Sequence, residues 1–404
     1  MLKLLIGKDW ISNRNEIFSR IAQDVHNKQG NRILLVPELI SHECERILCA
    51  TSGDTSSRYA EVLSFTRLVR RVSDYSGSAV DPCLDNGGRI VAMAAVARQL
   101  SSKLKAYAAM ETKPEFLESL MDAVDEFKRC CITSADLLDA SKAMDGNFAQ
   151  KLEELSLIME CYDSLCSRGK RDPRDQMTWL LEQMEDCDFA RDHTFYIDGF
   201  PDFTRQNLEI IAHIIAASPC VTVSLNCDRI GSDLLAFEKA GSTAQEIYQI
   251  AQRAGVEISV EVLPGREDAL TGIREKLFQG SILAGSCSGA LRTIRAETPF
   301  DECMAVLQKI LELVHSGYRY RDFAVVCTEL DTYKPLMNMI FHRYGIPLYC
   351  SGTENILQKS VVSTVLNALD AALNDFDPKN MIRYLRSALS PLDPDRCDIV
   401  GLVC

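Results

Sequence analysis

The chain has 404 residues, 47% of them hydrophobic and 25% charged, an ordinary composition for a globular protein of roughly two or three domains. Its formal net charge of −13 excludes a protein that coats nucleic acid with its whole surface, but allows one groove with a basic lining. No run reaches the roughly 18 apolar residues of a membrane-spanning helix, and the apolar start at Met1–Gly7 is too short for a secretory leader, so we expect a cytoplasmic protein without membrane contact.

The first strand, turn and helix lie where a nucleotide-binding protein has its phosphate-binding loop. An apolar strand ends at Gly7, and a helix is predicted from about residue 13 to residue 28. The loop motif requires further glycines and then Lys and Ser/Thr, whereas Asn13 and Arg14 occupy the last two places. We interpret Gly7, Lys8, Asn13 and Arg14 as part of a degenerate nucleotide site, with an ordinary strand–helix turn as the simpler alternative.

The stretch Thr194–Thr204 supplies the second part of that site. A short strand of β-branched and aromatic residues ends at Asp198, and a helix is predicted after it at 205–217. Nucleotide-driven motors hold Mg²⁺ through an Asp at the end of a parallel strand, and a Glu usually follows it to activate water. Here the next residue is Gly199, so we assign Asp198 to the degenerate site and predict no catalytic residue. A turn residue that stabilises Gly199 is the alternative.

The rest of the first 290 residues predicts an α/β fold with a parallel sheet and one helical insertion. Further strands are expected at 33–36, 61–64, 221–225 and 256–262. Between about residues 81 and 186 the pattern is almost entirely helical, with helices expected at 87–104, 114–131, 134–143 and 148–167.

A segment rich in Gly and Ser, Gly280–Gly289, is the predicted domain boundary. Beyond it, strands are expected at Leu291–Ala296 and Phe323–Cys327, and helices at 300–316, 333–344 and 361–373. The chain ends without a stop signal or polar tail, so we expect it to be a piece of a longer protein. Its sixteen cysteines contain no CxxC pair, so neither zinc nor an iron–sulfur cluster is expected within the chain.

Five short motifs occur in an order and spacing that resemble the AddB family, the second subunits of bacterial AddAB-type helicase–nucleases, and behind them the superfamily 1 helicases. The motifs are Leu35–Glu38, Ser64–Leu68, Tyr196–Phe200 with Phe203–Thr204, Gly317–Val325 and Tyr344–Pro347. The resemblance implies two RecA-like domains. The first comprises residues 1–80 and 187–285, split by a helical insertion at 81–186, and residues 290–404 begin a truncated second one.

The resemblance also implies a role in homologous recombination and double-strand break repair. An AddA-type motor and nuclease subunit unwinds DNA with ATP and Mg²⁺, while the AddB subunit holds the emerging single strand and scans it for a recombination hotspot. The family's iron–sulfur cluster belongs to a C-terminal nuclease domain that nothing here matches. No cofactor is therefore expected in this chain.

The family's single-strand contacts fall on the loops after the second and third strands and on the aromatic loop after Asp198. The resemblance assigns DNA contact to Ser41, Phe65, Arg67, Arg70, Phe200 and Phe203. Aromatic faces stack on bases of any sequence, and Arg pairs with phosphate or with a base edge. Two residue types depart from the family's usual ones, Leu39 and Arg70. The alternatives are that Phe65 is a core residue and that the arginines form a solvated helix face.

The leading hypothesis is a DNA-binding, helicase-like scaffold without ATPase activity. Two alternatives stay open. One is an atypical P-loop ATPase or helicase in which Lys8 replaces the missing lysine. The other is a structural adaptor that docks the motor subunit and never touches DNA.

Overall fold

A computed structural model describes residues 1–53, 55–79, 81–107, 113–267, 270, 271, 273, 291–351, 356–387, 389, 390, 393, 396 and 397. The chain divides into two compact units, Met1–Leu291 and Arg292–Cys404. The predicted boundary segment Gly280–Gly289 lies outside the described residues. No helix in the described ranges is long and apolar enough to cross a bilayer.

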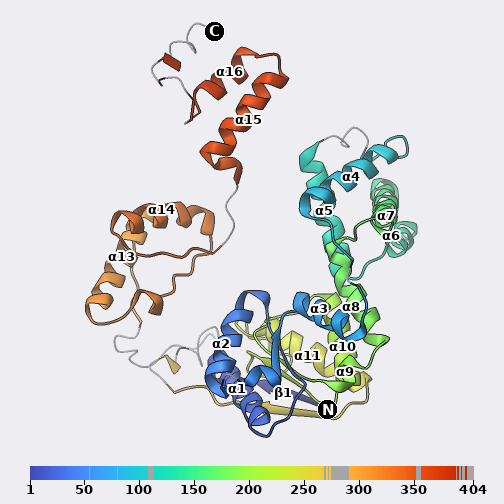
Figure 1. Ribbon diagram of the computed structural model, residues 1–404, viewed down its shortest axis with the longest axis vertical. Helices are drawn as coiled ribbons and strands as arrows, with labels where there is room; N and C mark the ends of the chain where they lie inside the picture. The colour runs from blue at the N-terminus through green and yellow to red at the C-terminus, as the bar shows by residue number, and fades with distance from the viewer. Residues whose placement is uncertain are drawn as a thin grey trace. The chain divides into compact units, whose positions relative to one another are not determined.

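The first unit is built on a six-stranded, all-parallel sheet of order β3-β2-β4-β5-β1-β6, with helices on both faces (Figure 1). The strands are β1 (Leu2–Ile6), β2 (Arg32–Leu35), β3 (Ala60–Leu63), β4 (Thr194–Ile197), β5 (Val221–Leu225) and β6 (Ile258–Val262). β1 lies between β5 and β6, so that Leu2 is in register with Val221 and Ile258. This confirms the predicted α/β class with a RecA-like parallel sheet.

Burial of both sheet faces explains why the central strands are continuous apolar runs rather than alternating ones. On one face, α1 (Trp10–His26) and α2 (Ser41–Ser52) pack Ile17, Ile21 and Leu48 against Leu5 and Leu34. The opposite face is covered by α3 (Phe65–Ser76), α8 (Gln176–Glu185), α10 (Arg205–Ala217) and α11 (Glu238–Arg253). The core is therefore two apolar layers with the sheet between them.

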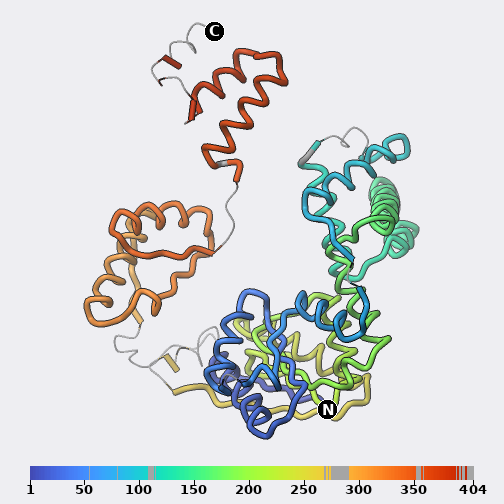
Figure 2. Tube along the Cα trace, viewed as in Figure 1, coloured from blue at the N-terminus to red at the C-terminus, as the bar shows by residue number. Residues whose placement is uncertain are grey.

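A helical body with its own core interrupts this sheet between β3 and β4. It contains α4 (Asn86–Leu100), α5 (Pro114–Arg129), α6 (Ser134–Lys142) and α7 (Gly146–Ser167). Met93, Leu120, Ile158 and Tyr162 are among its buried residues. The chain returns to β4 through α8 and the short α9 (Phe189–Asp192), and Figure 2 shows the trace leaving the sheet body and coming back.

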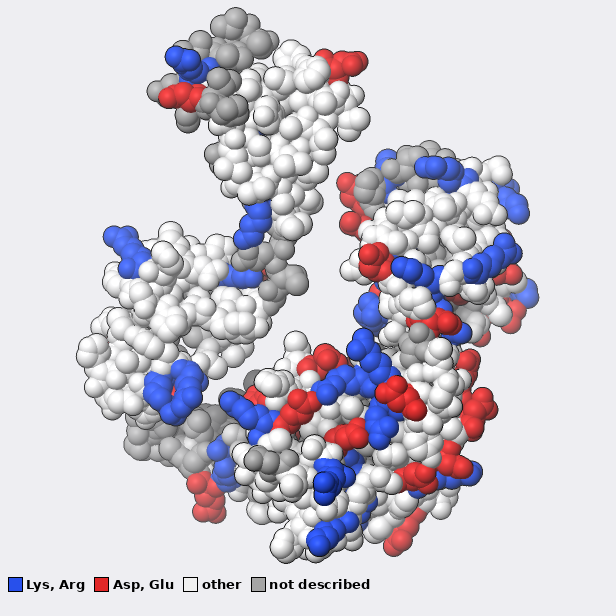
Figure 3. Space-filling view, in the orientation of Figure 1, with Lys and Arg blue, Asp and Glu red and all other residues white. Residues whose placement is uncertain are grey.

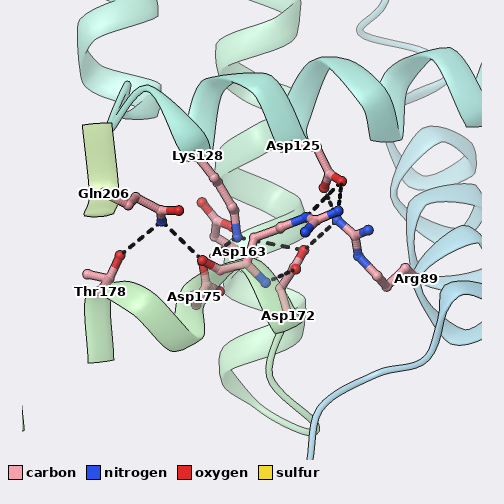
Figure 4. A network of polar contacts seen from close by, with 9 residues as sticks. Arg89, Asp125, Lys128, Asp163, Asp172, Asp175, Thr178 and Gln206 are labelled. Carbon is pink, nitrogen blue, oxygen red and sulfur yellow. Dashed lines mark hydrogen bonds and ion pairs between the residues drawn. The ribbon is translucent and has the colours of Figure 1, made fainter. Parts of the chain in front are cut away.

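A buried ionic network lies at the base of this insertion (Figure 4). The Lys128 Nζ is 2.6 Å from an Asp175 oxygen and 2.8 Å from an Asp163 oxygen, and the Lys128 side chain is 6% exposed. Burial alone would lower the pKa of Lys128, but the surrounding carboxylates raise it. Gln206 of α10 donates to the carbonyl of Arg174 at 3.1 Å, which ties the network to the sheet body. Further members are Arg89, Asp125 and Asp172.

The second unit has the predicted helices but not the predicted strands. Helices α13 (Pro299–His315) and α14 (Leu330–Arg343) pack around Leu307 and Phe341, and α15 (Ser360–Leu373) is followed by α16 (Pro378–Leu385). The strands expected at Leu291–Ala296 and Phe323–Cys327 are wrong, because neither segment pairs with another in the described residues. A strand is stabilised by its hydrogen-bonded neighbours, and Val326 is 93% exposed here. Single-turn helices occur at Glu38–Ile40, Ser56–Arg58, Pro173–Asp175, Tyr320–Asp322 and Ile356–Gln358.

Candidate functional site

The carboxyl edge of the sheet brings together two residues that the sequence assigned to one degenerate site. β1 and β4 are separated only by β5, so the turns after both strands lie at this edge. Arg14, in the second turn of α1, donates from Nε to Asp198 Oδ2 at 2.8 Å. The two side chains are 15% and 6% exposed. The Arg14 guanidinium therefore contacts the carboxylate at the position where a motor would bind Mg²⁺.

Asn13 fills the turn in which a phosphate-binding loop would present its backbone N–H groups. Its Nδ2 donates to the carbonyl oxygens of Gly7 at 3.2 Å and Leu225 at 3.1 Å, and the residue is 1% exposed. A Cβ atom on Gly7 would lie only 2.3 Å from Asn13 Oδ1, so the glycine allows this close approach. The interior of the turn is therefore occupied by the chain's own amide.

The N-terminus of α1 is capped by a carboxylate of the chain itself. Asp9 accepts hydrogen bonds from the Ile11 amide at 3.3 Å, the Ser12 hydroxyl at 2.7 Å and the Arg266 Nε at 2.8 Å. Burial alone would raise the pKa of Asp9, but the hydrogen bonds from Ser12 and Arg266 lower it to about 2. A negative charge is thus fixed at the helix end that binds phosphate in nucleotide-binding folds. Lys8 is half-buried beside it and lines a cavity on the β6 side of β1.

Gly199 has a backbone conformation that disfavours the glutamate of a working motor. Its φ of +83° is in the left-handed region, where residues with a side chain are strained. A Cβ atom there would lie 2.8 Å from Ile40 Cδ1 and 3.1 Å from Arg14 Nη2. A side chain at this position would have to displace both.

Three of the six predicted DNA contacts form an aromatic cluster at the ends of β3 and β4. Phe65 meets Phe200 edge to face with ring centroids 5.7 Å apart, and Phe200 meets Phe203 at 4.9 Å. Phe65 is only 8% exposed, whereas Phe200 and Phe203 are half-buried. Ser41 is buried, and its hydroxyl donates to the carbonyl of Glu38 at 2.9 Å.

Arg67 and Arg70, the two arginines predicted to contact DNA, lie in the first half of α3 at the same edge of the sheet and have different partners. Arg67 Nη1 donates to Glu45 Oε1 at 2.5 Å, with 43% and 37% of the side chains exposed. Arg70 is exposed and makes no ion pair with any residue of the described ranges. Figure 3 shows Lys and Arg interspersed with Asp and Glu over the visible face of the first unit. On this face, positive charge is locally balanced rather than gathered into one basic patch.

Sequence reasoning missed several residues that shape this edge. Asp9 directly precedes the first helix and Ser12 follows three residues later, which is a local capping signal that could have been recognised. Glu45 has no such signal, because its partner Arg67 is 22 residues away. Trp10 has no predicted role, yet it is 54% exposed and lies under the guanidinium of Arg14.

The parallel sheet and the helices on both of its faces define a RecA-like domain, and Arg14, Asp198, Asn13 and Asp9 make internal contacts at its carboxyl edge. The sequence profile described as "ADDB, N-terminal" matches residues 4–273. The chain belongs to the AddB family, which confirms the family predicted from the five motifs.

The chain is also similar to proteins whose names describe the B component of an ATP-dependent helicase/deoxyribonuclease. One from Clostridium perfringens (strain 13 / Type A) is 25% identical over 411 residues, which cover 96% of this chain and 35% of the relative. Relatives from Acetivibrio thermocellus and Geobacillus kaustophilus are 24% and 25% identical over 95% and 98% of this chain. The chain spans about a third of the length of these curated relatives.

Proposed function

We propose that this chain is the helicase-like part of the AddB subunit of an AddAB-type complex, which holds single-stranded DNA and hydrolyses no ATP. In this proposal an AddA-type motor subunit supplies the ATP- and Mg²⁺-dependent unwinding. The chain receives the emerging strand and takes part in scanning it for a recombination hotspot during double-strand break repair. Any iron–sulfur cluster belongs to a nuclease domain elsewhere in a longer protein.

The observation that carries the inactive state is the Arg14–Asp198 pair. Mg²⁺ requires oxygen ligands at about 2.0–2.1 Å. A guanidinium on the carboxylate at the end of β4 competes with the metal for the same oxygen atoms. The Ile11 N–H is already taken by Asp9, and the Asn13 side chain, which donates to the Gly7 and Leu225 carbonyls, occupies the space that a phosphate would need. Both halves of the nucleotide chemistry are therefore replaced by internal contacts.

Single-strand binding is supported by the residue types that converge at the ends of β3 and β4. Phe200 and Phe203 are half-buried and keep surface available for stacking, and Arg70 is an exposed cation one helical turn from Arg67. Base stacking on aromatic side chains tolerates any sequence, as a subunit that scans a moving strand requires. In this arrangement Phe65 does not stack on a base, since little of its ring is exposed. Its edge-to-face contact instead helps to fix the position of the Phe200 ring.

A structural adaptor without DNA contact is the second candidate, because Arg67 is already neutralised by Glu45 and Phe65 is buried. Binding of a labelled single-stranded oligonucleotide separates the two functions. The proposal predicts that Phe203→Ala and Arg70→Ala weaken binding, and that wild-type binding weakens as salt is added. The control is Arg253→Ala, which removes an exposed cation at the C-terminal end of α11, near the amino edge of the sheet. Equal affinity of all three variants would favour the adaptor.

An ATPase assay with single-stranded DNA tests the inactive state separately. We expect no turnover above background for the wild-type chain. Turnover that Asp198→Ala abolishes would refute the proposal and support an atypical P-loop ATPase that uses Lys8.

A further inference from the structure

Trp10 is exposed at the carboxyl edge of the sheet, beside the Arg14–Asp198 ion pair. It is the first residue of α1 and is 54% exposed. The guanidinium carbon of Arg14 lies 5.1 Å from the centroid of its ring, and Arg14 is itself held by Asp198. One face of the indole therefore rests on a cation that a nearly buried carboxylate fixes in place, while the rest of the ring remains in solvent.

We propose that Trp10 is a nucleobase-stacking residue that extends the single-strand path from the aromatic cluster to the end of β1. This inference rests on the proposed function. An indole is a large flat surface for a base, and stacking on an aromatic side chain depends little on the identity of the base. Because the contact with Arg14 already orders the ring, less conformational freedom is lost when a base binds.

The sheet order places Trp10 in line with the proposed DNA contacts. β1 and β4 are two neighbour spacings apart, and β4 and β3 are two more. At about 4.8 Å per spacing, the ends of β1 and β3 are roughly 19 Å apart. A stacked strand advances about 3.4 Å per nucleotide, so about six nucleotides span this edge. Asp198 connects the two ends, since it accepts a hydrogen bond from Arg14 and is followed after one residue by Phe200.

The exposed surface fits a base better than a protein partner. A stable protein interface covers about 800 Å² on each side, far more than one aromatic side chain provides. A single base, in contrast, needs one ring face. Asp198 neutralises the Arg14 charge beside the indole, so this site has no unbalanced charge that would attract a charged group. The exposed face of the ring is therefore suited to stacking on a base.

Intrinsic fluorescence can report this contact directly, because the chain contains only two tryptophans. In Trp179→Phe, which changes a half-buried residue of α8, Trp10 is the only tryptophan and can be excited selectively over the tyrosines. We expect a single-stranded oligothymidylate of about twelve nucleotides, roughly twice the path, to quench this emission. In anisotropy titrations Trp10→Ala is expected to weaken binding at least about fivefold, whereas Trp10→Phe, which keeps a stacking ring, stays within about twofold.

The control is Phe148→Ala, which removes a 56% exposed aromatic side chain from α7 in the insertion and should leave the affinity unchanged. If the oligonucleotide binds without quenching Trp10, and Trp10→Ala binds like the wild type, this inference is wrong and the proposed function stands. If no variant or wild-type protein binds DNA, the proposed function fails as well. Quenching by ATP but not by the oligonucleotide would overturn the strand path and assign the ring to a free nucleotide. The quenching test uses a chain with Trp10 intact, so it holds even if Trp10→Ala does not fold.

Discussion

Replacing Asp198 by Ala should destabilise the first unit without changing any nucleotide turnover. The substitution leaves the Arg14 guanidinium, whose side chain is 15% exposed, without its counter-ion. Removing one partner of a buried ion pair costs about 3–5 kcal/mol. Because Arg14 keeps some solvent contact and its place over the Trp10 ring, we expect the lower end, about 3 kcal/mol. Urea unfolding followed by circular dichroism measures the change.

Two further variants show whether the unpaired Arg14 charge causes the destabilisation by Asp198→Ala. Asp198→Asn keeps an acceptor oxygen for Arg14, so it should lower the free energy of unfolding by about half as much as Asp198→Ala. Adding Arg14→Met to Asp198→Ala removes the unpaired cation and should recover about 1–3 kcal/mol relative to additivity. If Asp198→Ala changes the free energy of unfolding by less than about 0.5 kcal/mol, the Arg14–Asp198 pair does not stabilise the fold and the reasoning is refuted.

Three other outcomes follow from the contacts. Lys128→Met should lower the free energy of unfolding by about 2 kcal/mol, because it removes charge-assisted hydrogen bonds to the part-exposed Asp163 and Asp175 and one of the two cations beside the buried Asp172. The exposed Lys142→Met should change the free energy of unfolding, measured in urea, by less than about 0.5 kcal/mol. Glu45→Gln should tighten binding of labelled single strands about two- to fivefold, since it frees Arg67 for phosphate; weaker binding would contradict this. Burial lowers the pKa of His193, so the unfolded state takes up a proton more readily and the folded state loses stability as pH falls through the unfolded value near 6.5. The shift of the urea midpoint between pH 7.5 and 5.5 should therefore be smaller in His193→Gln than in the wild type.

The sheet could be predicted because its signals are local. Apolar runs followed by Gly7 or by Asp198 mark strands that end at a turn, and the structure forms strands at both places. The same kind of signal failed at Phe323–Cys327, since an apolar run becomes a strand only if another strand pairs with it. The difference lies in long-range pairing, which a run of residue types does not encode.

The site was predictable in its position but not in its contacts. Spacing places Arg14 and Asp198 in one degenerate site, but the two residues are 184 positions apart and the sequence does not reveal that they form an ion pair. Residue type predicted aromatic side chains after β3 and β4, but not that Phe65 would be 8% exposed while Phe203 stays half-buried. Burial depends on the packing of α3 against the sheet, which single positions do not reveal.

The contacts at this edge depend on one another, as the proposed replacement of a nucleotide site by internal contacts requires. Asn13 fits the first turn because Gly7 has no Cβ, and it then bonds the backbone that a phosphate would otherwise face. Arg14 reaches Asp198 beside a residue that also lacks a Cβ, since a side chain on Gly199 would press against its guanidinium. Restoring any one motor residue therefore breaks a contact without rebuilding the site. Asp198 is explained by the cation that it holds, and needs no magnesium to account for its place at the end of β4.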